Sequence, residues 1–314
     1  MPAPLTRLAA DRRRTAYLAR LALDTDRFFE ERRAACPWCG SARLHTRPPA
    51  RGGLTTDECL DCAHVFQNPR LTPEGMAFYD GDPAARAPRP AATCRRHRAA
   101  ARAVPRLPEP ESWLDVGTGD AEFPRAAREF FPYTAFDGTD PTPRVLRARA
   151  AEHVEEAYVG ALATPALTAH LRSRYDVVSV LHHLEHTPDP GAELRAALAV
   201  LRPGGHLLLE LTDPAGPRHL FGPRPPHTLH LFPRGNIEAE LRSQGCEILN
   251  PPRRRAPWTT SYRVLARKPA ATARAIPAAP ATPARPAAPP TPAVPPPAPP
   301  PPAPPAHTPP RTPR

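Results

Sequence analysis

The chain has 314 residues, which is enough for a hydrophobic core in one large domain or two smaller ones. Its composition is skewed toward proline and arginine: it has 50 prolines, 42 basic residues of which Lys268 is the only lysine, and a formal net charge of +11. No stretch approaches the roughly 20 apolar residues of a membrane span, and the chain start lacks the apolar run of a secretory signal, so we expect a cytoplasmic protein.

The first 35 residues are predicted to be a helical segment. Apolar residues such as Leu8, Leu18 and Phe28 recur among many arginines at helical spacing over residues 5–34. This segment precedes the cysteines.

Two C-x-x-C pairs follow, separated by nineteen residues. Each pair can present two thiolates to one tetrahedral Zn²⁺, and the separation is typical of zinc ribbons. Redox chemistry at such pairs would need a thioredoxin-like βαβ context, which the surrounding sequence does not predict. We therefore predict that residues 36–82 form a zinc-ribbon-like module and linker, with a closed structural site at Cys36, Cys39, Cys59 and Cys62. His64 is at most a neighbour of this site, and Cys94 and Cys246 look unpaired.

Strand and helix signals alternate between residues 94 and 268, which is the pattern of an α/β domain. The predicted strands are 112–116, 133–137, 157–159, 175–181, 206–211, 247–249 and 262–266, and the predicted helices are 121–131, 143–151, 165–172, 190–201 and 233–244. Residues 269–314 are Pro/Ala/Thr repeats without hydrophobic periodicity, so we expect a disordered tail with local polyproline II structure. The tail is interpreted as inert, with a ligand for a proline-recognising domain as the alternative.

A glycine turn follows the first strand of this domain. Gly117 and Gly119 allow a tight turn and a close approach of the backbone to a ligand, but such a turn also fits dinucleotide sites. Two acids narrow the choice, because Asp115 precedes the glycines and Asp140 ends the next strand about twenty residues on. Asp140 is placed to accept hydrogen bonds from two ribose hydroxyls.

Four runs in this domain together resemble the class I S-adenosylmethionine (SAM) methyltransferases. They are Leu114–Asp120, Gly138–Pro143, Tyr175–His186 and Leu201–Glu210. The stretch from Cys59 to Tyr79 also resembles the leader of bacterial methyltransferases that carry a small zinc ribbon. The resemblance implies a Rossmann-like, mostly parallel sheet of seven strands that binds SAM.

The same resemblance implies the cofactor residues, which are Asp115, Gly117, Gly119, Asp140, Leu162 and Leu181. Ala121 replaces the usual third glycine, a mild change because alanine still allows close packing. The loop 160–163 has no acid where many relatives bind the adenine amine, so we expect backbone and apolar contacts such as Leu162 to hold adenine.

Several histidines follow the fourth strand, where ligands sit in open α/β sheets. His186, supported by Glu185, is predicted to be a general base that removes a proton from the methyl acceptor. The alternative is structural, with Glu185 capping a helix and His186 positioning the next loop. A second cluster, residues 225–232, resembles an acceptor-covering stretch in which His227 faces the substrate and His230 packs.

The leading hypothesis is therefore SAM-dependent methyl transfer to a small-molecule or sugar-like acceptor. The second is an RNA methyltransferase, with arginines in residues 12–33 and 253–255 tracking phosphate. Few aromatic residues are present to stack on bases, and the fourth strand lacks the Asn/Asp-Pro-Pro-Tyr/Phe step of base-amine enzymes. The third is a zinc-containing scaffold without catalysis. The acceptor atom (O, N or C) and the oligomeric state stay open.

Overall fold

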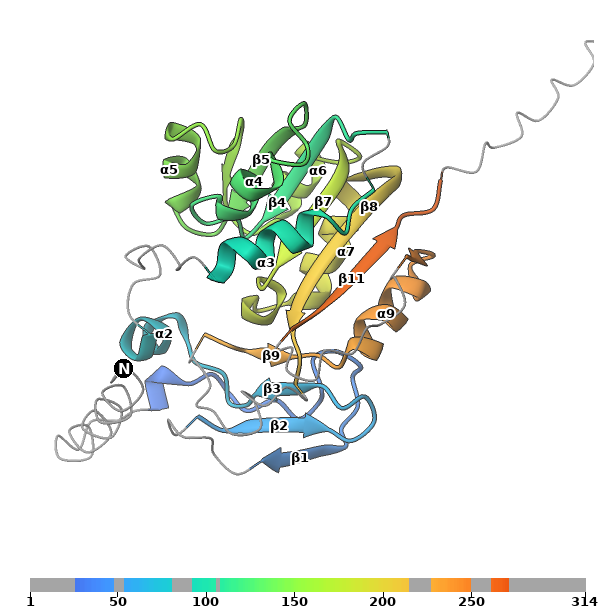
Figure 1. The fold of residues 1–314 in the computed structure, drawn as a ribbon. Coiled ribbons are helices and arrows are strands. Elements are labelled where there is room, and N and C mark those ends of the chain that lie inside the picture. The colour runs from blue at the N-terminus through green and yellow to red at the C-terminus, as the bar shows by residue number, and fades with distance from the viewer. Residues whose placement is uncertain are drawn as a thin grey trace, which may run out of the picture. The chain divides into compact units, whose positions relative to one another are not determined.

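The computed structural model describes residues 26–47, 54–80, 92–105, 108–214, 227–249 and 261–270 (Figure 1). Most of the predicted N-terminal helix and nearly all of the predicted tail lie outside these ranges, and so does any partner site in that tail. Residues 29–34 are described, and they do not form the predicted helix. Instead, a 3-10 turn, η1 (Asp26–Phe28), is followed by an antiparallel bridge between Phe29 and Leu71. In the described ranges, no helix is long and apolar enough to cross a membrane.

The larger of two sheets has seven strands in the order β10-β11-β8-β7-β4-β5-β6. The strands from β4 to β8 pair in parallel, whereas β11 and β10 run antiparallel at one edge. The strands are β4 Ser112–Val116, β5 Ala135–Asp140, β6 Ala157–Val159, β7 Tyr175–Leu181, β8 Leu201–Thr212, β10 Glu247–Ile248 and β11 Ser261–Arg267. The predicted Rossmann-like, mostly parallel seven-stranded fold is confirmed.

Helices cover both faces of this sheet (Figure 1). Successive side chains of a strand point to opposite faces, so Trp113 packs under α3 and α4 while Leu114 joins the core under α7 and α9. Trp113 and Leu114 are both fully buried, as expected of a strand covered on both sides. The helices are α3 Ala92–Ala101, α4 Glu122–Ala127, α5 Arg144–Ala150, α6 Pro165–His170, α7 Pro190–Val200 and α9 Arg234–Ser243.

The strand order reverses between β4 and β7, because the chain moves outward from β4 to β6 and then returns to the other side of β4. At such a switch point, a crevice opens at the carboxyl ends of the two strands, where open α/β sheets bind their ligands. The glycine turn follows β4 there, and a short 3-10 turn, η3 (Leu184–His186), follows β7.

A second sheet of four short strands contains the cysteine pairs. Its order is β1-β2-β3-β9. Three of its strands come from the cysteine module, β1 Leu44–Arg47, β2 Thr56–Cys59 and β3 Val65–Gln67, and helix α2 (Pro73–Asp80) follows them. The fourth, β9 (His230–Leu231), comes from the far part of the chain and was not predicted. The predicted division into residues 36–82 and 94–268 stays a prediction, and this shared sheet joins the two parts.

Candidate functional site

In the glycine turn between β4 and α4, every second residue has a positive φ, namely Gly117, Gly119 and Ala121. A Cβ atom added to Gly117 would lie 2.4 Å from Cγ and Nδ1 of His183. The His183 ring therefore packs directly on the turn, and only glycine leaves room for it. Ala121, which replaces the third glycine, tolerates φ of 57° in a fully buried position.

Asp140 ends β5 beside this turn. Its Oδ2 accepts a hydrogen bond from the Gly119 N–H at 2.9 Å, and its Oδ1 accepts from the backbone N–H and hydroxyl of Thr142 at 2.9 and 2.5 Å. A carboxylate has about four acceptor positions, so these three bonds leave about one. Asp140 can therefore accept one ribose hydroxyl while it holds the turn, and a second would have to displace a Thr142 bond.

Asp115 lies at the end of a buried hydrogen-bond chain. Trp113 Nε1 donates to Ser179 Oγ at 2.9 Å, and the Ser179 hydroxyl donates to Asp115 Oδ1 at 2.6 Å. Burial raises the pKa of the Asp115 carboxyl to about 6, in spite of the hydrogen bond from Ser179. A buried carboxyl costs less free energy when it is paired with a cation or a hydrogen-bond donor than when it is surrounded by apolar groups alone. The amino group of a bound methionine moiety is a donor of that kind.

The acid-free loop 160–163 is supplied with a carboxylate from another element. Glu193 of α7 is buried, and it accepts hydrogen bonds from the N–H groups of Leu162 and Ala163 at 3.2 and 3.0 Å. Glu193 also pairs with His183 Nε2 at 3.3 Å. Burial opposes ionisation, but these hydrogen bonds hold the pKa of Glu193 below its ordinary value.

This placement changes the expected role of Leu162. The Leu162 side chain is fully buried in the core, so it supports the loop from below instead of presenting an apolar surface to adenine. Leu181, the last residue of β7, is half-buried against the core on the α3 side. Sequence reasoning missed Glu193, although an acid among the apolar residues of α7 is a signal of a buried polar role.

His182 lies between two buried carboxylates. Its Nδ1 lies 3.4 Å from Glu185 Oε1, and its Nε2 lies 3.2 Å from Glu210 Oε1. Burial opposes protonation, but the two acids raise the pKa of His182. Glu210 also pairs with Arg263 and with Arg96 of α3. The backbone of His182 has a φ of 50°, a strained conformation for a residue other than glycine.

The structure therefore gives Glu185 a different partner from the one expected. Glu185 is held by His182 and by the Thr212 N–H at 2.7 Å, whereas His186 donates from Nδ1 to the His227 carbonyl at 2.7 Å. Burial opposes ionisation of Glu185, but its bond to His182 is the main cause that lowers its pKa, to about 2. Burial lowers the pKa of His186 to about 4, so the imidazole is neutral at pH 7. Because the acceptor is a carbonyl, the proton is on Nδ1 and the lone pair is on Nε2.

The His227 and His186 rings lie 4.8 Å apart, so the structure brings together the two histidines singled out in different motifs. His230 packs, with its ring stacked on His64 and Phe232. The preceding part of that motif, residues 225–226, lies outside the described residues.

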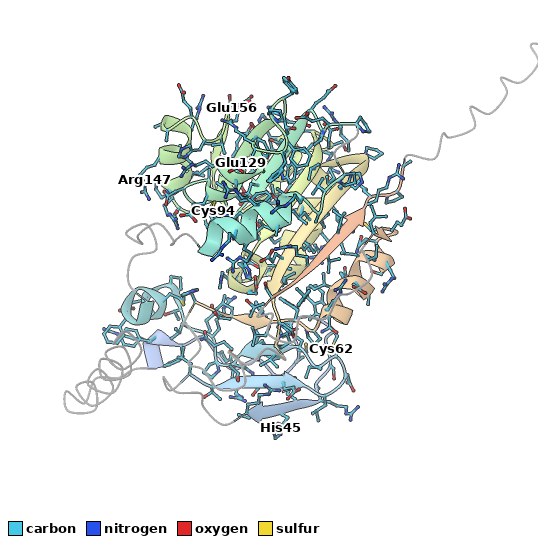
Figure 2. All side chains as sticks on the ribbon, in the orientation of Figure 1. His45, Cys62, Cys94, Glu129, Arg147 and Glu156 are labelled. Carbon is cyan, nitrogen blue, oxygen red and sulfur yellow. The ribbon has the colours of Figure 1, made fainter. Side chains whose placement is uncertain are left out.

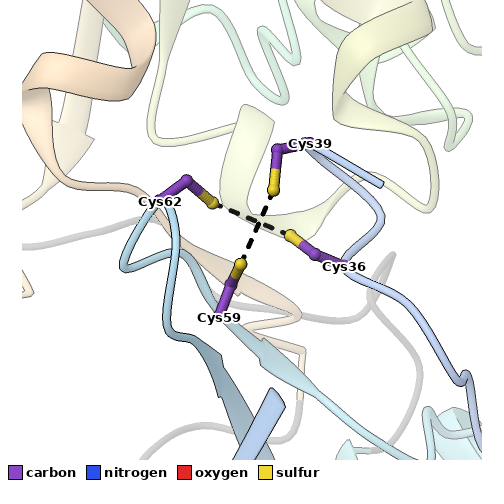
Figure 3. A group of neighbouring side chains, drawn as sticks. All are labelled: Cys36, Cys39, Cys59 and Cys62. Atoms are coloured by element: carbon purple, nitrogen blue, oxygen red, sulfur yellow. Dashed lines mark hydrogen bonds between the residues drawn. The ribbon is translucent and has the colours of Figure 1, made fainter. Parts of the chain in front are cut away.

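The four cysteines of the two pairs converge on one point (Figure 3). Their Sγ atoms all lie within 4.8 Å of one another, with 3.8 Å between Cys36 and Cys62 and 3.5 Å between Cys39 and Cys59. Four sulfurs at about 2.3 Å from a tetrahedral Zn²⁺ would be about 3.8 Å apart, so the donor set fits that ion. Cys94 lies apart on α3, away from Cys62 (Figure 2).

A family model described as "Methyltransferase domain" matches residues 89–250. The ubiquinone biosynthesis O-methyltransferase of Bordetella avium is 28% identical over 129 residues, which cover 40% of this chain and 54% of that one. The enzyme of the same name from Serratia proteamaculans is 38% identical over 97 residues, covering 30% and 39%. The chain thus spans about half or less of these relatives. A solved 1,6-didemethyltoxoflavin-N1-methyltransferase of Burkholderia thailandensis is 21% identical, with a TM-score of 0.43 over 57% of this chain and 79% of that one.

Proposed function

The chain belongs to the methyltransferase-domain family, and on that premise we propose that it transfers a methyl group from SAM to a hydroxyl oxygen of a small molecule. The O-methyltransferase names of the relatives support oxygen as the acceptor atom. The arrangement at the carboxyl ends of β4 and β7 supports the site, because it combines a backbone turn, two acids and a neutral histidine.

The cofactor residues are assigned to the turn and the acids that flank it. Gly117 and Gly119 let the backbone approach the donor, Asp140 accepts a ribose hydroxyl, and Asp115 faces its amino group. Leu162 and Leu181 support this site from the core. When bound, SAM supplies an electrophilic methyl carbon on a sulfonium, and no side chain has to form a covalent bond.

His186 is assigned as the general base. Its Nε2 takes the hydroxyl proton as the acceptor oxygen bonds to the methyl carbon, and the pair of electrons of the broken carbon–sulfur bond stays on sulfur. The products are the methyl ether, S-adenosylhomocysteine and a proton on His186 that passes to solvent. The single observation that carries this assignment is the bond from His186 Nδ1 to the His227 carbonyl, because it leaves Nε2 as the basic nitrogen. The His227 carbonyl orients the base directly, and the Glu185 carbonyl holds the segment that carries it by accepting from the Leu229 N–H, so neither residue takes the proton.

The test is a labelled-SAM assay against phenols, nucleotide-linked sugars and RNA, with His186→Gln and a control, His45→Gln. His45 is exposed on β1 of the cysteine module (Figure 2), so its replacement should change nothing. We expect His186→Gln to lower kcat by about 100-fold or more with an unchanged Kd for SAM. With a base of pKa about 4, kcat/KM should be flat above about pH 5 and fall below it. Unchanged turnover would remove His186 from the base role, and labelling of RNA alone would replace the small-molecule proposal.

The cysteine cluster is assigned as a structural zinc site. Cys36, Cys39, Cys59 and Cys62 occupy all four positions of a tetrahedral ion, so no position is left for a substrate. The module around them has strands of only three or four residues, and such a small sheet gains much of its stability from a metal.

A further inference from the structure

The segment 227–231, here called the bridging segment, completes the small sheet although it lies far along the chain. Its strand β9 pairs antiparallel with β3, with Leu231 opposite Val65 and His230 opposite Phe66. The Gln67 N–H also donates to the Leu229 carbonyl at 2.9 Å. One side of the bridging segment is therefore held by the cysteine module.

The other side of the bridging segment holds η3. The Leu229 N–H donates to the Glu185 carbonyl at 2.9 Å, and the His227 carbonyl accepts from His186 Nδ1 at 2.7 Å. Leu229 thus uses its carbonyl toward the module and its N–H toward η3. A second link runs beside it, from Arg70 to the Pro188 carbonyl at 3.1 Å.

The bridging segment and the residue after it also contact the cysteines' immediate surroundings. The His64 and Phe232 rings are stacked, with their centroids 4.5 Å apart, and the Trp38 and Phe232 ring centroids are 4.8 Å apart. His64 Nδ1 also lies 3.5 Å from Cys36 Sγ. On α9, Asn236 Nδ2 donates to the Cys62 carbonyl at 2.8 Å. Both C-x-x-C pairs therefore touch the part of the chain that leads into and out of β9.

We propose that metal binding at the four cysteines positions His186, acting on the His227 carbonyl through the bridging segment, which β3 and the Asn236–Cys62 bond together hold in place. The inference rests on the proposed zinc site and on the proposed role of His186. β3 has three residues and, among the described strands, pairs only with β2 and β9, and β2 ends at the ligand Cys59. A sheet this small does not persist alone in water, so loss of the ion releases β3 and then β9. Without the fixed His227 carbonyl, the His186 proton distributes over both ring nitrogens.

Hydrogen exchange on the full chain tests this coupling with the metal bound and after chelation, while elemental analysis reports the zinc content. We expect exchange to accelerate by about tenfold or more in peptides covering 54–67, 227–232 and 184–187, and to stay unchanged in β4. ¹⁵N-histidine spectra, assigned with His186→Gln, should show Nδ1 protonated in the metal-bound protein and averaged nitrogens after chelation. The proposal would be overturned if exchange after chelation became faster in 54–67 but stayed slow in 227–232 and 184–187. An unchanged ¹⁵N spectrum of His186 after chelation would also overturn it.

If chelation also accelerates exchange in β4, general unfolding would hide the coupling. The variant Asn236→Ala then tests the coupling with the metal still bound. It removes the bond to the Cys62 carbonyl, and Ser243→Ala on the same helix is the control because, among the described residues, the Ser243 hydroxyl bonds to the Glu240 carbonyl of α9 itself. We expect faster exchange at 227–232 in Asn236→Ala alone, and equal exchange in the two variants would overturn the proposal. None of these measurements needs a methyl acceptor, so failure of the coupling is distinguishable from failure of the methyl-transfer proposal, and absent zinc identifies failure of the metal site.

Discussion

Replacing Gly117 by alanine should damage both the fold and the cofactor site, and the structure separates the two causes. Gly117 has a φ of 71°, which costs an L-residue about 1–2 kcal/mol. The added Cβ would also lie 2.4 Å from two atoms of the His183 ring, closer than any real contact. Overpacking of this kind lowers the free energy of unfolding by a further amount of about 1–3 kcal/mol. The expected loss of unfolding free energy is therefore about 2–5 kcal/mol.

Two other glycines supply matched controls. Gly40 has nearly the same φ, 76°, but its Cβ would meet nothing within 4 Å, so Gly40→Ala should show the conformational cost alone. Gly235, near the start of α9, has neither a positive φ nor a close neighbour. Gly235→Ala should be neutral or stabilising by about 0.5–1 kcal/mol, because alanine is the better helix former.

Urea unfolding of the zinc-loaded variants measures the three free energies, and calorimetry measures SAM binding. We expect Gly117→Ala to be the least stable of the three variants, Gly40→Ala to be intermediate and Gly235→Ala to be the most stable. Only Gly117→Ala should bind SAM more weakly. Equal stability of the Gly117 and Gly40 variants would show that His183 moves aside without cost. With SAM affinity also retained, the argument that this turn and His183 form one packed site would be refuted.

Two further predictions concern carboxylates. Asp140→Asn should weaken SAM binding by about 10- to 100-fold in calorimetry, the loss of one charged hydrogen bond, while Asp176→Asn at the opposite end of β7 should leave it unchanged; equal effects would refute the ribose assignment. Glu185 has a folded pKa of about 2, below the ordinary 4.5, so its contribution of about 3 kcal/mol is present above pH 4.5 and is lost as the pH falls toward 2. Glu185→Gln should therefore be less stable than the parent in urea unfolding at pH 7 but not near pH 2, and a constant difference between the two would contradict the buried pair with His182.

Three strands of the parallel sheet could be predicted from the sequence. β4, β6 and β7 begin and end where predicted, because short apolar runs between turn residues leave few alternatives. β5 differs, since it spans Ala135–Asp140 and runs through Gly138, where residues 133–137 were predicted. The structure explains that glycine: a Cβ there would lie 2.7 Å from Thr118 Cγ2, so the turn and the strand need it to pack.

The convergence of the four cysteines was also accessible to sequence reasoning, because the spacing of two C-x-x-C pairs is itself visible in the chain. The pairing of β9 was not accessible. It has two residues, and its partner β3 precedes it by more than 160 positions, so no local pattern marks it. Its consequence for His186 is likewise invisible in a motif, because the acceptor of the His186 proton is a backbone carbonyl, which every residue has.

The Leu-Glu-His step shows that neighbours in a motif can have different partners in the fold. Neighbours in sequence suggested that Glu185 supports His186, yet a 3-10 turn directs the two side chains to different sides, Glu185 toward β8 and His186 toward the bridging segment. The pKa of His182 is raised and the pKa of His186 is lowered, although the two histidines are only four residues apart. That difference follows from burial and from carboxylate partners on distant strands. The tertiary structure therefore decides which histidine at this edge can accept a proton.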